Sequence, residues 1–96
     1  MVSAKTLKLY FNDLKKRIIF PFTGQYEKET GRLFEDLIEV QVLDVDKRID
    51  DFYGIICLIK IGRKTGYVPL ADIEPRSDDA NFALIDDYKT WFWNYR

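Results

Sequence analysis

The spacing of apolar residues changes twice along this chain, and that change limits the fold more than any other feature. Near the N-terminus they recur at three- and four-residue steps, at Leu7, Tyr10, Phe11, Leu14 and Ile18. This is the period of a helix that buries one face. From Pro21 to Glu74 the apolar residues instead tend to alternate with polar ones, as in half-buried strands. A helical period then returns, so the sequence predicts a helix, several strands and a second helix.

Both helices have recognisable ends. The first is expected over Ser3–Arg17, with Ser3 as N-cap and three basic residues in the last turn, where cations suit the helix dipole. Pro21 prevents its continuation. The second is expected over Asn81–Tyr95, with Asp78 and Asp79 as N-cap candidates. Its apolar stripe is wide, as expected for a helix that covers a sheet: Phe82, Leu84, Ile85, Tyr88, Trp91, Phe92 and Tyr95.

Between the helices, turn residues separate short strands. The clearest strand is Tyr53–Ile61, and the glycines of GRKTG predict a hairpin that joins it to Tyr67–Leu70. Thr23–Lys28 and Leu37–Asp44 are the earlier strands, and ADIE is a short strand or a helical turn. Alternation puts one set of side chains on a single face of the clearest strand: Tyr53, Ile55, Cys57, Ile59 and Ile61.

These elements predict an α+β fold, a small antiparallel sheet of four to five strands flanked by an N-terminal and a C-terminal helix. The strands have the size of a small SH3-like barrel, and GYVPLADIE resembles the end of such barrels. A chain of 96 residues is expected to be a single domain. Residues 1–19 would hold the first helix, 20–76 the β core and 77–96 the last helix.

Residue types exclude several functions. The chain has no histidine and one cysteine, which excludes histidine catalysis, histidine zinc sites and an intrachain disulfide. Cys57 lies within the apolar run IICLI and is interpreted as a buried small hydrophobe, which fits a reduced, cytoplasmic location. GRKTG lacks the residue order of a phosphate-binding loop. No enzymatic activity is therefore predicted, and neither a membrane span nor a secretory signal is expected.

Charge is distributed unevenly. Residues 1–33 carry a net charge of +4 and residues 34–96 a net charge of −5. Acids concentrate in two stretches, residues 35–51 and residues 72–87, each with a net charge of −5. A nucleic-acid binder needs a basic stripe, and none follows residue 33. The acidic stretches favour cations or basic partners over nucleic acid or membranes.

The first acidic stretch contains the best candidate ligands: Asp44, Asp46, Asp50 and Asp51. Asp44 and Asp46 share a strand face, and a returning turn would bring Asp50 and Asp51 near them. A hard divalent cation such as Ca²⁺ relieves the mutual repulsion of carboxylates. The helix–loop–helix calcium motif does not match, because Arg48, Ile49 and Ile55 occupy its fifth, sixth and twelfth positions. The alternative is a solvated acidic hairpin loop.

A second acidic cluster is a further candidate site: Asp72, Glu74, Asp78 and Asp79. Asp72 and Glu74 would share a face in a strand. Asp78 and Asp79 have an alternative role, as caps of the last helix. The two clusters would form one anionic surface if they met at the same end of the sheet.

Four segments together resemble the small prokaryotic calcium-binding family CcbP: FPFTGQY, IEVQVLDVD, YGIICLIKIGRKTGYVPLADIE and LIDDYKTWFWNY. The resemblance extends from about Phe20 to Tyr95. It implies Ca²⁺ binding through surface acidic residues, without a helix–loop–helix motif, on a barrel-like sheet with flanking helices. It also implies a role in buffering cytoplasmic calcium. Carried over by position, Asp44, Asp46, Asp50 and Asp51 are the expected ligands.

The competing hypothesis is an SH3-like protein-interaction module that binds no metal. Exposed aromatic residues, with Tyr53, Tyr67 and Trp93 as candidates, would form its peptide groove. The aromatic face of the last helix is a candidate for self-association. The chain is accordingly expected to be a monomer or a weak homodimer.

Overall fold

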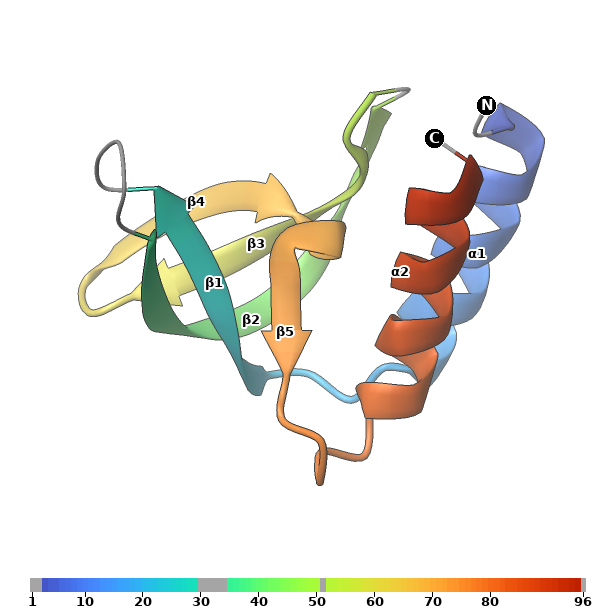
Figure 1. Ribbon diagram of the computed structural model, residues 1–96. Coiled ribbons are helices and arrows are strands. Elements are labelled where there is room, and N and C mark those ends of the chain that lie inside the picture. The colour runs from blue at the N-terminus through green and yellow to red at the C-terminus, as the bar shows by residue number, and fades with distance from the viewer. Residues whose placement is uncertain (1–2, 30–34, 51, 96) are drawn as a thin grey trace.

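The computed structural model describes residues 3–29, 35–50 and 52–95. Within these ranges the chain has an α+β fold in which two helices, α1 (Ala4–Arg17) and α2 (Phe82–Tyr95), lie side by side next to a curved sheet (Figure 1). The strands are β1 (Phe22–Glu29), β2 (Glu35–Asp50), β3 (Gly54–Ile61), β4 (Lys64–Pro69) and β5 (Ile73–Pro75). A 3₁₀ turn, η1 (Leu70–Asp72), joins the last two. The prediction of an α+β fold with an antiparallel sheet of four to five strands and a helix at each end is confirmed. The finer SH3-like description stays a prediction.

The strands form one antiparallel sheet in the order β4-β3-β2-β1-β5. The first half of β2 pairs with β1 and its second half pairs with β3. At the far edge, β5 returns to pair with β1, with Gly24 opposite Pro75. The sheet therefore joins segments that are far apart in the sequence, and β2 runs through its centre.

The segment predicted as an acidic loop is part of β2, which continues to Asp50 and does not end at Asp44. Val45 is buried and Ile49 is partly buried against the core, and both pair with β3. The register shifts between Val45 and Ile49, where extra residues bulge from the ladder. That bulge breaks the alternation of apolar and polar residues, which explains why the sequence pattern indicated a loop.

The hairpin between β3 and β4 is tighter than predicted. Ile61 pairs with Lys64, so the turn consists of Gly62 and Arg63 alone, and Gly62 adopts a φ of +59°. Consequently β4 begins at Lys64 and not at Tyr67. The two alternatives for ADIE both occur in part, because η1 ends at Asp72 and β5 follows it.

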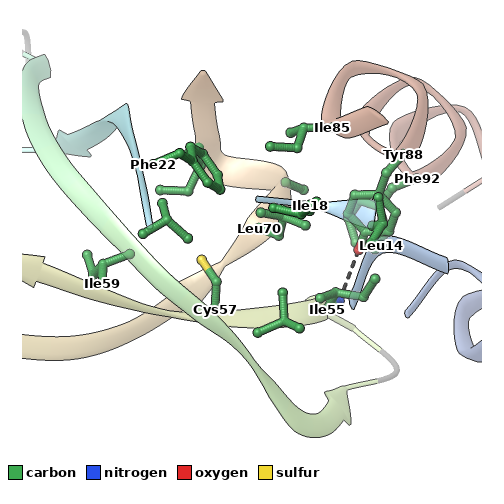
Figure 2. Close-up of a cluster of buried hydrophobic side chains, with 14 of the residues drawn as sticks. Leu14, Ile18, Phe22, Ile55, Cys57, Ile59, Leu70, Ile85, Tyr88 and Phe92 are labelled. Carbon is green, nitrogen blue, oxygen red and sulfur yellow. Dashed lines mark hydrogen bonds between the residues drawn. The ribbon is translucent and has the colours of Figure 1, made fainter. Parts of the chain in front are cut away.

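The hydrophobic core lies between the sheet and the helices (Figure 2). Of the five residues expected on one face of the clearest strand, Ile55, Cys57 and Ile59 are buried, whereas Tyr53 and Ile61 are exposed. From the helices come Leu7 and Leu14 of α1 and Ile85, Tyr88 and Phe92 of α2. Among the described residues, neither α1 nor α2 combines the length and the hydrophobicity that a membrane-spanning helix requires.

The helix ends agree with the sequence in part. The Ser3 side chain accepts a hydrogen bond from the Thr6 N–H at 3.5 Å, as expected of an N-cap. Before α2, Asp79 accepts from the Asn81 N–H at 2.7 Å, whereas Asp78 pairs with Arg76. The buried Asn81 amide exchanges two hydrogen bonds with the Ile19 backbone, at 2.8 and 3.0 Å. These two hydrogen bonds connect the start of α2 to the segment after α1.

Candidate functional site

The candidate ligands Asp44, Asp46 and Asp50 of the first acidic stretch lie in the second half of β2, which leads to the turn before β3. Asp44 lies 3.4 Å from the Lys15 ammonium of α1, and both side chains are about half exposed. Asp44 also accepts a hydrogen bond from the Val45 N–H at 2.8 Å. In this arrangement Asp44 connects the sheet to α1 at the protein surface.

Among the described carboxylates of this stretch, Asp46 accepts the most hydrogen bonds. Its Oδ2 accepts from Arg48 Nε at 3.0 Å and from Arg48 Nη2 at 2.7 Å, while its Oδ1 accepts from the Arg48 backbone N–H at 3.1 Å. The Asp46 side chain is only 16% exposed, whereas that of Arg48 is 71% exposed. The hydrogen bonds from Arg48 hold the pKa of Asp46 below its usual value. Asp46 is therefore a firmly ionised, partly buried anion.

Asp50 closes the turn between β2 and β3. Its Oδ1 accepts hydrogen bonds from the N–H groups of Phe52 and Tyr53, at 2.7 and 2.8 Å. Aspartate favours turns because its side chain can bond to backbone N–H groups that follow it. The fourth candidate ligand, Asp51, lies outside the described residues.

The register of β2 and β3 determines how far apart these carboxylates lie. Asp44 pairs with Leu58 and Asp50 pairs with Gly54. Those partners are four residues apart on β3, which corresponds to about 13 Å along the strand. The expectation that the turn returns Asp50 to the side of Asp44 is therefore wrong, because the intervening chain is extended. Within the described ranges, no three Asp, Glu, Cys or His residues are grouped closely enough to hold a metal ion.

Three residues of the second acidic cluster make separate contacts with different partners. Glu74 accepts from Lys89 of α2 at 2.6 Å, and Lys89 also donates to the Ile73 carbonyl at 3.0 Å. Asp72 belongs to η1, so the expectation that it shares a strand face with Glu74 is wrong. Asp78 pairs with Arg76 at 3.1 Å, and Asp79 accepts from Asn81 as described above.

A groove of about 410 Å³ lies beside the first acidic stretch, between the β2–β3 hairpin and β4. Tyr53, Tyr67 and Pro69 contribute to its lining, and Arg48 and Asp50 join them. Both tyrosines are more than half exposed. The Arg48 guanidinium lies 5.0 Å from the centre of the Tyr67 ring. Nothing in the sequence pattern gave Arg48 a role, although its position two residues after Asp46 was a signal for the ion pair.

The buried reactive groups serve packing. Burial raises the pKa of the Cys57 thiol to about 12, and this thiol lies 3.4 Å from the Val68 carbonyl oxygen. Burial also raises the pKa of Tyr88 to about 12, and its hydroxyl accepts a hydrogen bond from the Ile55 N–H at 2.9 Å (Figure 2). The interpretation of Cys57 as a buried hydrophobe is confirmed.

The sequence also matches a known family. The model of the family CcbP, described as calcium binding, matches residues 6–92 and so includes both acidic stretches. The chain belongs to the CcbP calcium-binding family. Membership in CcbP supports Ca²⁺ as the ion that this protein binds. Among proteins with curated descriptions, none has a sequence that matches this chain.

A solved CcbP structure has the same fold. The crystal structure of Anabaena CcbP superposes with a TM-score of 0.73 at 21% sequence identity. The match covers 90% of this chain and 72% of the Anabaena chain. At this identity the likeness concerns the fold, so ligand positions in this chain have to be argued from its own residues.

Proposed function

We propose that this protein binds Ca²⁺ through the carboxylates of the first acidic stretch, Asp44, Asp46, Asp50 and Asp51, and that it buffers calcium in the cytoplasm. Membership in a calcium-binding family is the observation that carries the proposal. The stretch supports it because Asp44, Asp46 and Asp50 lie in the second half of β2, and carboxylate oxygens are the ligands that Ca²⁺ prefers. The ions would be held without a helix–loop–helix motif.

The separation of Asp44 and Asp50 favours two contact regions over one compact cage. At the turn, Asp50 is adjacent in sequence to Asp51, and its Oδ2 has no hydrogen bond to any described residue. At the bulge, Asp44 and Asp46 are two residues apart. Each region would supply few protein ligands, so water would complete the coordination. Such open, partly hydrated sites suit Ca²⁺, which tolerates irregular geometry.

The decisive experiment is a calorimetric titration of metal-stripped protein with Ca²⁺. Replacing Asp46 and Asp50 with Asn keeps an oxygen at each position but removes two charges. Because ligand charge largely determines calcium affinity, the double variant should bind at least about tenfold more weakly, which corresponds to about 1.4 kcal/mol. The matched control replaces Asp86 and Asp87 of α2 with Asn, which removes the same charge from a helix.

Two outcomes would contradict this placement. If the α2 control lost more affinity than the Asp46 and Asp50 variant, the ligands would lie outside the first acidic stretch. Asp72, Glu74, Asp78 and Asp79 would then be tested in the same way. If the unaltered protein bound no calcium, the proposed function itself would be wrong.

The groove beside the hairpin favours a second candidate function, that of a peptide-binding module. Exposed aromatic residues beside a proline are typical of surfaces that receive extended peptides, and Tyr53, Tyr67 and Pro69 supply them. This function requires no metal. Saturating calcium that left every property of the protein unchanged would favour it over calcium binding.

A further inference from the structure

The groove beside the β2–β3 hairpin has two exposed aromatic rings in its lining, and one of them has a fixed support. Tyr53 is 51% exposed and Tyr67 is 57% exposed. The Arg48 guanidinium lies 5.0 Å from the centre of the Tyr67 ring, within the range of a cation–π contact. Asp46 holds that guanidinium through hydrogen bonds of 3.0 and 2.7 Å. The Tyr67 side of the groove is thus ordered in advance, which lowers the entropic cost of binding a ligand.

The rest of the lining is an apolar part of the sheet surface. Ile56 of β3 and Pro69 of β4 are paired partners, and Ile49 of β2 adjoins them in the groove. All three side chains are partly exposed. Strand β3 has β2 on one side and β4 on the other, so a chain that lies across it cannot pair with it as a further strand. Such a chain is bound by side chains, through apolar contact and side-chain hydrogen bonds.

The polar groups of the lining are mainly hydrogen-bond donors. Tyr53 and Tyr67 each carry a phenolic hydroxyl, which can donate to a carbonyl oxygen. Asp46 uses the Nε and Nη2 donors of Arg48, and Nη1 makes no hydrogen bond to any described residue. A complementary chain is rich in carbonyl oxygens and poor in N–H groups. A run of prolines has this character, because proline keeps its carbonyl and lacks the N–H.

The charges of the lining favour a cation in the ligand. Only two of the lining residues, Arg48 and Asp50, are charged. Arg48 is neutralised by Asp46, whereas the described part of the chain shows no ion pair to Asp50. Asp50 Oδ1 accepts from two backbone N–H groups of the turn, and Oδ2 has no hydrogen bond to any described residue. A lysine or arginine of the ligand would complement this oxygen.

We propose that this groove binds a proline-rich segment in the polyproline II conformation, with a basic residue of the segment beside Asp50. The inference rests on the second candidate function, peptide binding, and supplies its ligand class. Polyproline II has no internal hydrogen bonds, so its carbonyls face outward and reach the hydroxyls of Tyr53 and Tyr67. Its proline rings pack on the tyrosine rings and on Ile56. The segment is already extended when free, so it loses little conformational entropy on binding.

Fluorescence anisotropy with three labelled peptides tests the ligand class on the full chain. The first probe has about nine residues, which is three turns of polyproline II, all proline except for one central arginine. The second carries glutamate in place of that arginine. The third keeps the arginine and replaces the prolines with alternating valine and serine, which favour a strand. The proline–arginine peptide should bind at least about tenfold more tightly than either of the others, because only it matches both the donors and the charge.

Variants place the binding in the groove. Tyr67→Ala should weaken binding of the proline–arginine peptide about tenfold or more, as expected of an aromatic contact residue. Tyr95→Ala is the matched control, because Tyr95 is also 57% exposed and does not line the groove. It should change the affinity by less than about 1.5-fold. Tyr67→Phe keeps the ring and removes the donor, so it should cost about threefold. Circular dichroism verifies that each variant is folded.

Asp50→Asn tests the basic residue of the ligand. Asparagine keeps an oxygen for the two N–H groups of the turn and removes the charge. The preference for the arginine peptide over the glutamate peptide should therefore fall below about twofold. An unchanged preference would overturn the placement of the basic residue beside Asp50.

The outcomes separate the ligand class from peptide binding itself. Tight binding of the proline–arginine peptide that depends on Tyr67 and not on Tyr95 supports the proposal. Equal affinities for the three peptides, or equal effects of Tyr67→Ala and Tyr95→Ala, would overturn it. Tighter binding of the valine–serine peptide that depends on Tyr67 would overturn the ligand class and leave peptide binding intact. If no peptide bound, both would be overturned, whereas calcium binding would still be decided by its own titration.

Discussion

Gly54 is the first residue of β3, at the point where the β2–β3 hairpin packs against α2. It is buried and has a φ of +74°, in the left-handed region. A Cβ atom at this position would collide with the Tyr88 hydroxyl and would lie 2.7 Å from Phe92 Cε1. Substitution with Ala should therefore strain the backbone and separate the hairpin from the helix. Gly54→Ala tests whether α2 supports the hairpin that carries the candidate calcium ligands.

The size of the effect follows from two contributions. The left-handed conformation costs a residue with a Cβ about 1–2 kcal/mol, and overpacking a filled core costs about 1–3 kcal/mol. Gly54→Ala should thus lower the free energy of unfolding by about 3 kcal/mol, which corresponds to a fall in Tm of roughly 12–24 °C for a domain of this size. That is a large fraction of the about 5–15 kcal/mol that stabilises a typical domain.

Gly62→Ala is the matched control. Gly62 also has a positive φ, of +59°, but no atom lies within 4 Å of a Cβ built there. It carries the backbone penalty without the collision and should cost only about 1 kcal/mol. Urea denaturation, followed by the fluorescence of Trp91 and Trp93, measures both variants.

The cause is tested by adding Tyr88→Phe, which removes the colliding hydroxyl. In that background, Gly54→Ala should cost about 0.5–1 kcal/mol less than it does alone. Equal losses of stability for Gly54→Ala and Gly62→Ala would refute the reasoning. They would mean that the hairpin does not pack beneath α2 as the structure has it.

Three further predictions concern calcium and the buried groups. Millimolar Ca²⁺ should raise Tm by mass action and should bind more tightly than Mg²⁺, which demands a regular octahedron; equal affinities would indicate a diffuse anionic surface. Native Cys57 should resist alkylation at pH 8 and react after unfolding, because burial raises its pKa to about 12; rapid native reaction would contradict its burial. Burial raises the pKa of Tyr88 from 10.0 to about 12, so the folded protein favours the neutral phenol. The contribution of Tyr88 to the free energy of unfolding is therefore fully present below about pH 10 and is lost as the pH rises toward 12. Urea titrations from pH 8 to 11 should show that decline, and Tyr88→Phe should reduce its slope.

Local patterns in the sequence determined the elements that depend on neighbouring residues. The three- and four-residue spacing and the Ser3 cap were enough to predict α1, because helix periodicity and capping involve residues within a few positions of one another. The isoleucine-rich run of β3 was enough to predict a strand for the same reason, and Ile55, Cys57 and Ile59 of its expected common face are buried. The acidic stretch and the four CcbP-like segments indicated calcium, and the family assignment supports that ion.

Contacts between distant segments decided the remaining features. Strand β2 continues past its bulge to Asp50 because it pairs with β3. No local sequence pattern specifies the register of that pairing. Likewise, the separation of Asp44 from Asp50 and the position of Lys89 beside Glu74 depend on packing between elements. Charge composition could indicate that the protein binds a cation, but it could not reveal that Arg48 forms an ion pair with Asp46. The partner of a carboxylate is determined by which side chains the folded backbone brings within hydrogen-bonding distance.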